Sequence, residues 1–293
     1  MTAIRSILAA TDFSPGANAA VGRAVQLAEA HGASLRMLYA FDAGVWQRLE
    51  AGFDAAGPKL EPGTDARIRE RLIDAAQSLA TQTGLEVGAE FAIGTAHDAI
   101  AAGVNSIDAS LLVIGARALP SIVGLGSVAA KALRAPACPV LIVRCGQCQP
   151  YRQVLTALDI ADGGADPAAL AVAAFPAARH VLLHAVDPAL HRALGLGGMA
   201  REQAHAWLDS IHAHADRELR ALARSLGGQA VHPITTEIVD DAPARAILAF
   251  AASMPADCVV VGHHGQSAPA QAFLGSMAQH VIHHTMLDVL VVP

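Results

Sequence analysis

The sequence predicts two α/β domains in tandem, each with a parallel sheet covered by helices on both faces. Its 293 residues suffice for two domains of about 150 residues each. An internal repeat supports this division, because segment 7–12 (ILAATD) returns as 154–159 (VLTALD), and 112–115 (LVIG) returns as 259–262 (VVVG). In both halves short, continuous apolar segments alternate with amphipathic helical ones, the pattern of buried parallel strands.

The expected strands follow the repeat. In the first half they lie near 4–10, 34–41, 86–93, 110–115 and 139–143, and in the second near 152–158, 179–186, 230–238, 257–262 and 288–292. A long crossover helix is predicted over 199–226, with an apolar stripe that includes Leu219 and Leu226 and a stop at Gly227-Gly228. The apolar pattern breaks at 146–150, so we predict domains over 1–146 and 150–293.

Composition excludes several classes of partner. The net charge is -6 and no Lys/Arg-rich block occurs, so nucleic acid is not an expected partner. The longest apolar runs are far shorter than the ~20 residues that span a membrane, and no signal-like stretch precedes Asp12. Four cysteines in a chain of this length make no disulfide framework. These observations predict a cytoplasmic protein.

A candidate ligand site lies at the carboxyl ends of the second-half strands, where open parallel sheets bind ligands. Asp159 ends the first of these strands and Gly262 the fourth, and the chain then runs through Gly265 to Gly275-Ser276 and a helix over 277–284. Glycines allow a close backbone approach, and the first amides of a helix attract anions. We expect Ser276 to be the N-cap of that helix. The alternative is ordinary turn-and-cap chemistry, with no ligand at all.

The charge of this segment bears on its chemistry. Residues 262–276 contain no Lys or Arg, so a phosphate held there would depend on backbone amides, Ser276 and His263 or His264. Fast phosphoryl transfer usually recruits fixed cations or a metal. The segment therefore favours nucleotide binding over catalysis.

At these residues the sequence resembles the universal stress protein family in its tandem two-domain form. Nucleotide-binding members carry Gly, two residues, Gly, nine residues and then Gly-Ser or Gly-Thr, which residues 262–276 match without a gap. Supporting features are Asp12 and Asp159 at strand ends, the strand exit 182–187 (LLHAVD) and segment 138–143 (CPVLIV). The resemblance covers nearly the whole chain.

The resemblance implies doubly wound, Rossmann-like domains with a five-stranded parallel sheet in the order 3-2-1-4-5. It also implies an adenine nucleotide, ATP with or without Mg²⁺, across the strand edge of the second domain. Two domains of this family pair through their fifth strands, here 140–143 and 289–292, and a homodimer of whole chains is left open. The positions that the resemblance assigns to the nucleotide are Asp159, Ala185 (through its backbone), Gly262, His264, Gly265, Gly275, Ser276 and Met277.

The first half departs from the pattern. Ala118 stands where the second glycine is expected, and only seven residues separate it from Gly126-Ser127. We therefore expect the second domain to bind ATP and the first to bind it weakly or not at all. The second half departs elsewhere, because 287–289 (LDV) replaces Cys-Pro-Val and Asp241 occupies the place of Gly94.

The leading hypothesis is a nucleotide-responsive stress regulator with at most slow ATP hydrolysis and no assigned catalytic residue. A nucleotide-independent stress-protective scaffold, in which the glycine loop is purely structural, is the alternative. An enzyme of the related adenine-nucleotide-hydrolysing folds is disfavoured, because no Ser-Gly-Gly-type loop follows the first strand and no nucleophile is paired with a base.

Four further patterns concern cysteine, histidine and tryptophan residues. Cys145 and Cys148 have the spacing of a redox pair or half a zinc site, but no second pair completes it. His280 and His284 lie one helical turn apart without a carboxylate to complete a ligand set, so surface placement is favoured and no metal is assigned. Trp207 is expected in the core or an interface. Because 12 of the 14 histidines follow residue 150, the charge of the second domain is expected to respond between about pH 5 and 7.

Overall fold

The computed structural model describes residues 4–44, 63–116, 132–133, 137–144, 149–160, 165–189, 200–263 and 274–293. Contacts within the chain divide it into two compact units. We call residues 3–148 the N-terminal unit and residues 149–293 the C-terminal unit. Each is described below by itself.

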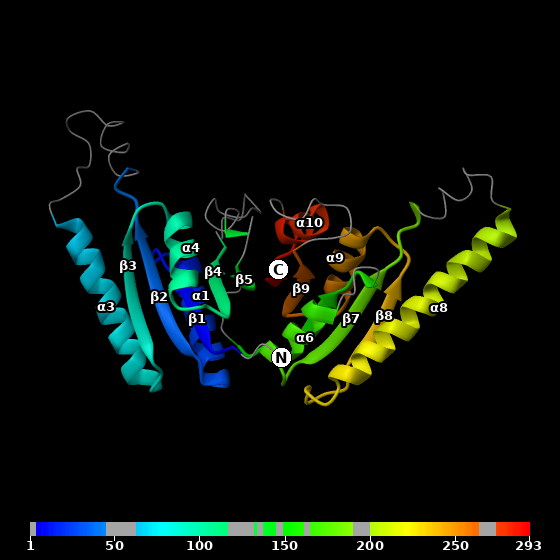
Figure 1. Ribbon diagram of the computed structural model, residues 1–293, viewed down its shortest axis with the longest axis horizontal. Helices are drawn as coiled ribbons and strands as arrows, with labels where there is room; N and C mark the ends of the chain where they lie inside the picture. Colours follow the sequence, from blue (N-terminus) through cyan, green and yellow to red (C-terminus); the bar gives the residue numbers. More distant parts are fainter. Residues whose placement is uncertain are drawn as a thin grey trace. The chain divides into compact units, whose positions relative to one another are not determined.

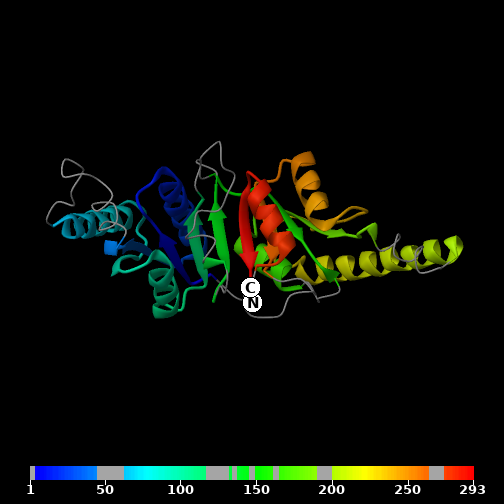
Figure 2. The ribbon, with the colours of Figure 1, turned by 90° about the horizontal axis from the view of Figure 1, so that it is seen from above.

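The N-terminal unit is a parallel sheet in the order β3-β2-β1-β4-β5 (Figure 1). Helices α1 and α4 lie on opposite faces of this sheet (Figure 2), and α3 packs against β3 and β2. The elements are β1 (Ser6–Ala10), α1 (Pro15–His31), β2 (Ser34–Phe41), α3 (Thr64–Thr83), β3 (Val87–Ile93), α4 (Ala96–Ser106), β4 (Leu111–Gly115) and β5 (Val140–Val143).

The C-terminal unit repeats this topology, with strands in the order β8-β7-β6-β9-β10. Numbered within the unit, this order is again 3-2-1-4-5, so the predicted fold class is confirmed. The elements are β6 (Gln153–Ala157), α6 (Ala165–Ala174), β7 (Arg179–Ala185), α8 (Arg201–Leu226), β8 (Thr235–Val239), α9 (Pro243–Ser253), β9 (Cys258–Gly262), α10 (Ser276–His284) and β10 (Asp288–Val292).

One strand of the C-terminal unit begins later than the sequence pattern predicts. The expected strand started at residue 230, whereas β8 starts at Thr235. Pro233 has no N–H to give to a neighbouring strand, so the ladder forms only after it. Val231 instead donates to the Pro176 carbonyl at 2.9 Å and leaves its side chain exposed. The other strand bounds agree with the prediction to within two residues.

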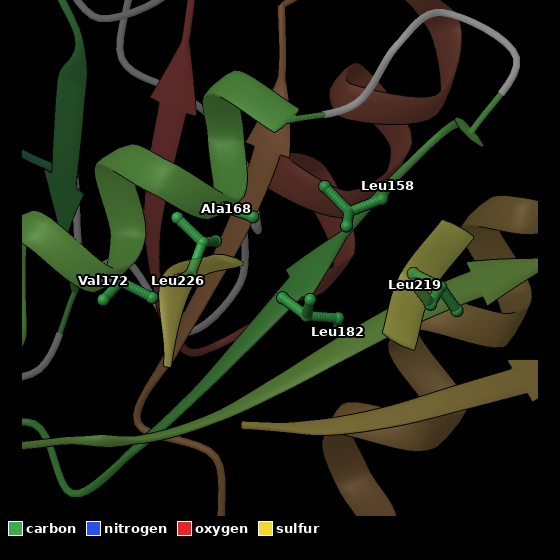
Figure 3. Packing of buried hydrophobic residues seen from close by; sticks show 6 residues of the cluster. All are labelled: Leu158, Ala168, Val172, Leu182, Leu219 and Leu226. Carbon is green, nitrogen blue, oxygen red and sulfur yellow. The ribbon is translucent and has the colours of Figure 1, made fainter. Parts of the chain in front are cut away.

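The crossover helix α8 is anchored through its second half. The predicted apolar stripe is buried at Ala215, Leu219 and Leu226, whereas Trp207 near the start of the helix is 38% exposed. Trp207 therefore lies outside the core, and its place at an interface stays a prediction. The buried cluster joins the helix to β7 and α6 (Figure 3), and its members are Leu158, Ala168, Val172, Leu182, Leu219 and Leu226.

In the N-terminal unit the first turn of α1 touches the end of β4 through bare backbone. A Cβ added to Gly115 would lie 2.4 Å from the Gly16 carbonyl oxygen, and one added to Gly16 would lie 2.6 Å from the Ala116 carbonyl oxygen. No side chain fits at either position without moving the backbone. Gly115 thus has a packing function in this unit, whatever binds nearby.

The unusual start of the fifth strand in the C-terminal unit has a structural partner. Asp288, which replaces the proline of the family pattern, is fully buried and accepts a 2.6 Å hydrogen bond from the Tyr151 hydroxyl. The Tyr151 ring packs edge-on against Phe175, with centroids 4.8 Å apart. A buried carboxylate requires such donors, so the departure at 287–289 is compensated across 137 positions of sequence.

Candidate functional site

The candidate site of the C-terminal unit lies where the strand order reverses, at the carboxyl ends of β6 and β9. These two strands are neighbours in the sheet, although β7 and β8 lie on the far side of β6. In doubly wound sheets, ligands bind at the carboxyl ends of two such neighbouring strands, where the strand order reverses. Asp159 follows β6, and Gly262 ends β9.

Strand register places Asp159 level with Ala185. Ala157 pairs with Leu183 in the ladder between β6 and β7, so a two-residue continuation aligns Asp159 with Ala185. Leu158 extends this ladder, because its N–H donates to the Leu183 carbonyl at 2.9 Å. The Leu158 carbonyl accepts from Nδ1 of His184 at 3.0 Å. The N–H and the carbonyl of Leu158 are thus both held by β7, and the Asp159 residue that follows is exposed.

The start of α10 supplies the amides that the sequence predicted. The first helical hydrogen bond runs from Gln279 N–H to the Gly275 carbonyl at 2.9 Å. The amides of Ser276, Met277 and Ala278 precede it and have no acceptor within the helix. They lie at the positive end of the helix dipole, where a phosphate oxygen is favoured.

The N-cap of α10 differs from the prediction. Gly275, not Ser276, is the N-cap residue, and no side chain caps this helix. The expectation that Ser276 caps the helix is therefore wrong, because Ser276 already has helical geometry as its first residue. Its exposed side chain lies on the first turn, beside the three amides that have no acceptor within the helix.

Backbone hydrogen bonds hold the two ends of the glycine loop together. Gly275 N–H donates to the His263 carbonyl at 2.9 Å, and His263 N–H donates to the Val292 carbonyl at 2.6 Å. His263 itself is buried, 2% exposed. The loop thus leaves β9 and returns to α10 at one point of the sheet edge. Two predicted site residues, His264 and Gly265, lie outside the described residues.

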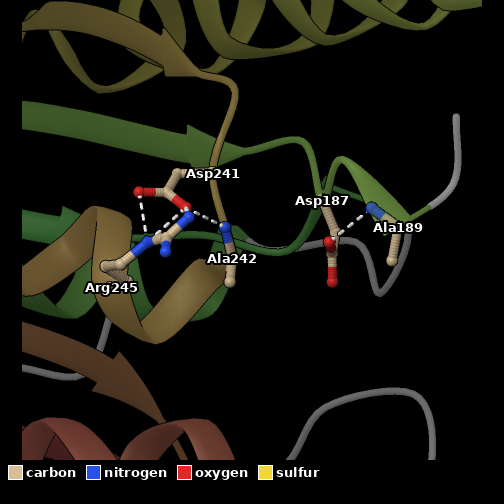
Figure 4. Close-up of polar contacts among 5 residues, drawn as sticks. All are labelled: Asp187, Ala189, Asp241, Ala242 and Arg245. Atoms are coloured by element: carbon tan, nitrogen blue, oxygen red, sulfur yellow. Dashed lines mark hydrogen bonds and ion pairs between the residues drawn. The ribbon is translucent and has the colours of Figure 1, made fainter. Parts of the chain in front are cut away.

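A charged cluster near the ends of β7 and β8 was not predicted as part of the site (Figure 4). Asp241 accepts from Nε of Arg245 at 2.6 and 2.7 Å, and its Oδ1 accepts from Ala242 N–H at 2.7 Å. The hydrogen bond from Arg245 is the main reason why the pKa of Asp241 lies below its usual value. The same hydrogen bond, and then the charge of Asp241, raise the pKa of Arg245. Asp187, which accepts from Ala189 N–H at 2.8 Å, adds a smaller contribution by its charge.

The sequence held a signal for this cluster. Asp241 and Arg245 are four apart at the start of a helix, a spacing that brings opposite charges together. Arg245 places a cation near the carboxyl ends of β7 and β8. It was not predicted as part of the site because the sequence argument considered only the cations within residues 262–276. The arrangement differs from the N-terminal unit, where Gly94 stands in place of Asp241 with a φ of 139°.

The same edge of the N-terminal unit is filled with aromatic rings. Phe13 follows Asp12 and stacks on Tyr39, with centroids 5.6 Å apart, and Tyr39 stacks on Phe91 at 5.9 Å. Arg71 of α3 covers the Phe13 ring at 4.1 Å. Burial, and then the negative charge of Asp12, raises the pKa of Tyr39, which Arg71 partly offsets. The departures at Ala118, Gly126 and Ser127 lie outside the described residues.

Metal sites, membrane-spanning helices and cysteines can be assessed for the residues that the structure describes. Within them, no group of three or more His, Cys, Asp or Glu side chains is placed to hold a metal ion. Nor is any helix in that part of the chain both long and apolar enough to cross a membrane. Cys145 and Cys148 lie outside it, whereas Cys138 and Cys258 are buried and not joined in a disulfide. Burial raises the pKa of Cys138 to about 11, so it is a poor nucleophile.

Comparison with solved structures supports the tandem architecture. A universal stress protein from Archaeoglobus fulgidus DSM 4304 matches with a TM-score of 0.67 and 19% identity over 98% of this chain and 97% of its own. A functionally unknown protein from Pseudomonas aeruginosa PAO1 matches with a TM-score of 0.67 and 20% identity over 99% of this chain and 93% of its own. At these identities the likeness concerns the fold.

A shorter relative was solved with a nucleotide. This universal stress protein in complex with cAMP is 25% identical to the present chain and covers 49% of it and 98% of its own length, with a TM-score of 0.35. No curated protein matches the sequence. The model of the universal stress protein family matches residues 3–144 and again residues 150–293. The chain therefore belongs to the universal stress protein family, with two copies of the family domain.

Proposed function

We propose that the C-terminal unit binds ATP and that the protein acts as a nucleotide-responsive regulator. One arrangement carries the proposal: α10 begins beside His263 at the end of β9 with amides that have no acceptor within the helix, and β9 pairs with β6, whose end Asp159 follows. An anion-binding helix terminus and an exposed strand end are the two parts that a nucleotide spanning this edge requires.

Each part of the nucleotide has its own set of residues in this proposal. Asp159 and the backbone of Ala185 contact the adenosine end. The ribose and phosphates lie along the glycine loop and the first turn of α10, with contacts from Gly262, His264, Gly265, Gly275, Ser276 and Met277. Mg²⁺ would enter on the phosphates, as it does when a site offers few carboxylates, with water completing its coordination.

The proposal assigns the N-terminal unit weak or no ATP binding. In that unit Phe13 and Tyr39 stack beside Asp12, where the C-terminal unit has the smaller Ile160 and His184. Rings at this edge reduce the space that an adenine would need. The shortened glycine loop around Ala118 adds a second restriction, because the loop has fewer residues to surround a triphosphate.

Binding rather than turnover is the expected chemistry. The helix amides are fixed dipoles that stabilise a bound phosphate, whereas rapid transfer also needs a positioned nucleophile and a concentrated positive charge. Arg245 is already engaged by Asp241. The proposal therefore includes hydrolysis only as a slow side reaction.

Isothermal titration of the full chain with ATP and Mg²⁺ tests the proposal. We expect about one ATP per chain, and loss of binding in Gly275→Val, because the β-branched side chain would crowd the phosphate amides. The matched variant of the first half, Gly126→Val, should leave the isotherm unchanged. A stoichiometry near two that is retained in Gly275→Val would contradict the assignment to the C-terminal unit.

A second candidate is the nucleotide-independent scaffold, favoured by the packing of Gly115 against Gly16. That contact shows that a glycine of this motif has a purely structural use in one unit. Mass spectrometry of material released by denaturing the purified protein separates the two candidates. ATP or ADP in the released material supports the nucleotide proposal, and an ATP-insensitive, nucleotide-free protein supports the scaffold. Pairing of the fifth strands, a homodimer and a cytoplasmic location stay predictions.

A further inference from the structure

The exposed side of α10 carries two histidines in contact. His280 and His284 are one helical turn apart, both are exposed, and their rings stack with centroids 4.0 Å apart and an interplanar angle of 19°. Two imidazole nitrogens bound to one metal at about 2.1 Å lie roughly 3 Å apart when they occupy neighbouring coordination positions. The stacking shows that the two rings lie on the same side of the helix, within reach of one another, and a shared metal requires the rings to rotate so that one nitrogen of each faces it.

A backbone contact fixes the protonation of one ring. Nδ1 of His284 lies 2.8 Å from the His280 carbonyl oxygen. Because a carbonyl oxygen only accepts, Nδ1 carries the hydrogen, and Nε2 of the neutral ring presents a lone pair. Metal-binding histidines are commonly oriented in this way, with the second nitrogen donating to a carbonyl or carboxylate.

The position in the helix also favours a cation. Both histidines lie in the second half of α10, which ends at His284. The carboxyl end of a helix carries the negative pole of its dipole, so a positive ion is stabilised there. The proposed phosphate site is at the amino end of the same helix. Its first residue, Ser276, lies about 12 Å from His284 along the helix axis at 1.5 Å per residue.

We propose that His280 and His284 form a two-histidine site for a divalent transition metal, filled out by water. Imidazole nitrogens select Ni²⁺, Cu²⁺ or Zn²⁺ over Mg²⁺ and Ca²⁺, which prefer oxygen ligands. With two protein ligands and open positions, the site would bind metal reversibly and leave room for an outside ligand. Metal bound here stabilises α10, the helix whose first turn the nucleotide proposal uses, but the site does not depend on that proposal.

The test is a Ni²⁺ titration of the full chain, carrying no affinity tag, at neutral pH. We expect His280→Ala and His284→Ala each to weaken binding at this site at least tenfold. The double variant should have the same Ni²⁺ affinity as either single variant, because removing one imidazole already prevents chelation. Alanine is a better helix former than histidine, so α10 should persist, which circular dichroism checks.

His214→Ala is the matched control, since His214 is an exposed histidine on α8 with Ser210 and Glu218, rather than histidine, four positions away. Its isotherm should equal that of the parent protein. The proposal is overturned if His284→Ala binds Ni²⁺ as the parent does, or if His214→Ala weakens binding equally. Should an alanine variant fold poorly, His284→Gln replaces it, with the same two outcomes.

A thermal measurement gives a second readout. Ni²⁺ that binds the folded chain should raise the unfolding temperature of the parent protein and of His214→Ala, and should raise it less in His280→Ala. Equal shifts in all three proteins would contradict the paired site. ATP titration of His280→Ala should match the parent, so that loss of metal binding is distinguishable from loss of the nucleotide site.

Discussion

The carboxyl-end faces of the two sheets are built on one backbone plan and filled differently. One additional backbone hydrogen bond extends the pairing of β1 with β2, and an equivalent bond extends the pairing of β6 with β7. Thr11 N–H donates to the Leu38 carbonyl and Leu158 N–H to the Leu183 carbonyl, each at 2.9 Å. The next pair on the neighbouring strands is Tyr39 and Phe91 in one unit, but His184 and Ile238 in the other.

This difference separates what the fold requires from what each unit does. The register and the ladder are common to both units, so they belong to the architecture. The aromatic stack, covered by Arg69 over Phe91 and Arg71 over Phe13, is confined to the N-terminal unit. The change from rings to smaller side chains is the difference that the proposed single nucleotide site needs.

At the opposite edge of each sheet, two backbone amides at the start of the first strand are bound by a side chain of a different type in each unit. In the N-terminal unit the Ser110 hydroxyl accepts from the amides of Arg5 and Ser6 at 2.9 and 3.1 Å. In the C-terminal unit a carboxylate oxygen of Asp257 accepts from Arg152 and Gln153 at 2.6 and 2.9 Å. Two amides at the start of the first strand are thus satisfied in both units, by a hydroxyl in one and a charge in the other.

The largest expected effect tests whether the two long helices are equally anchored. Leu72 of α3 and Leu219 of α8 are equivalent in the repeat, and both are buried. Replacing either with alanine should lower the free energy of unfolding by about 2–5 kcal/mol, measured by urea denaturation. Ile73→Ala, at a position 40% exposed on α3, serves as the control and should cost only about 0.5 kcal/mol. A similarly small loss for Leu219→Ala would show that α8 is weakly attached.

The next effect concerns the hydrogen bond found in only one unit. Tyr151→Phe removes the phenol donor to the buried Asp288 and should cost about 1–3 kcal/mol of unfolding free energy. The equivalent N-terminal positions are Ile4 and Pro139, which make no such bond. Tyr39→Phe, a tyrosine of the N-terminal unit, should change stability little. Equal losses from the two substitutions would mean that the effect comes from removing a tyrosine hydroxyl at either position and not from the bond to Asp288.

A smaller effect should distinguish the helices that follow the third strand of each unit. Thr95 caps α4, where its hydroxyl accepts from Asp98 N–H at 3.3 Å, whereas Ala242 begins α9 without a side-chain cap. Thr95→Ala should cost about 1 kcal/mol in urea denaturation. The reverse change, Ala242→Thr, should gain a few tenths of that amount, since Asp241 already binds the Ala242 amide. A gain as large as the Thr95 loss would show that Asp241 contributes no capping.

The smallest effect is confined to acid and to the C-terminal unit. His180 is buried, 1% exposed, and thus differs from the exposed histidines of α8 and α10. Burial lowers its pKa, and the bond to the Phe175 carbonyl partly offsets this. The unfolded chain therefore binds a proton more readily, and stability should fall as pH drops below about 6.5.

The contribution of His180 to the pH dependence of stability can be measured by thermal unfolding between pH 7.5 and 5. His180→Gln retains a donor for the Phe175 carbonyl but does not titrate, so its unfolding temperature should fall less steeply than that of the parent protein. Exposed His214, replaced by glutamine, provides the control and should leave the slope unchanged. A parent and a His180→Gln variant with identical slopes would exclude His180 as the source.

Much of this architecture was predictable because its signals are local or repeated. Continuous apolar segments located the strands, and the repeat aligned Asp12 with Asp159 and Leu72 with Leu219. The start of β8 was misplaced because the apolar spacing continued through Pro233, where the ladder cannot form. The exposure of Trp207 was not predictable, because amphipathic periodicity identifies a helix face but not which part of that face the rest of the fold covers.

The site was predictable at its backbone and less so at its side chains. Strand ends and glycines placed Asp159, Gly262 and Gly275 at one edge, because parallel strands share an edge by topology. The Tyr151–Asp288 bond joins residues 137 positions apart, and a single sequence holds no periodic signal for such a pair. The predicted N-cap of α10 was one residue too late. A sequence pattern locates a helix but does not fix its first residue, and the N-cap follows from that residue.

The contact between Gly16 and Gly115 affects how relatives of this protein should be sorted into binders and non-binders. A glycine that ends the fourth strand is sterically required wherever a neighbouring helix begins against it, so selection would retain it in a domain that lost its ligand long ago. Counting that glycine toward a nucleotide signature would overestimate the number of active domains. The later positions of the motif, beyond the reach of this packing constraint, are the informative ones.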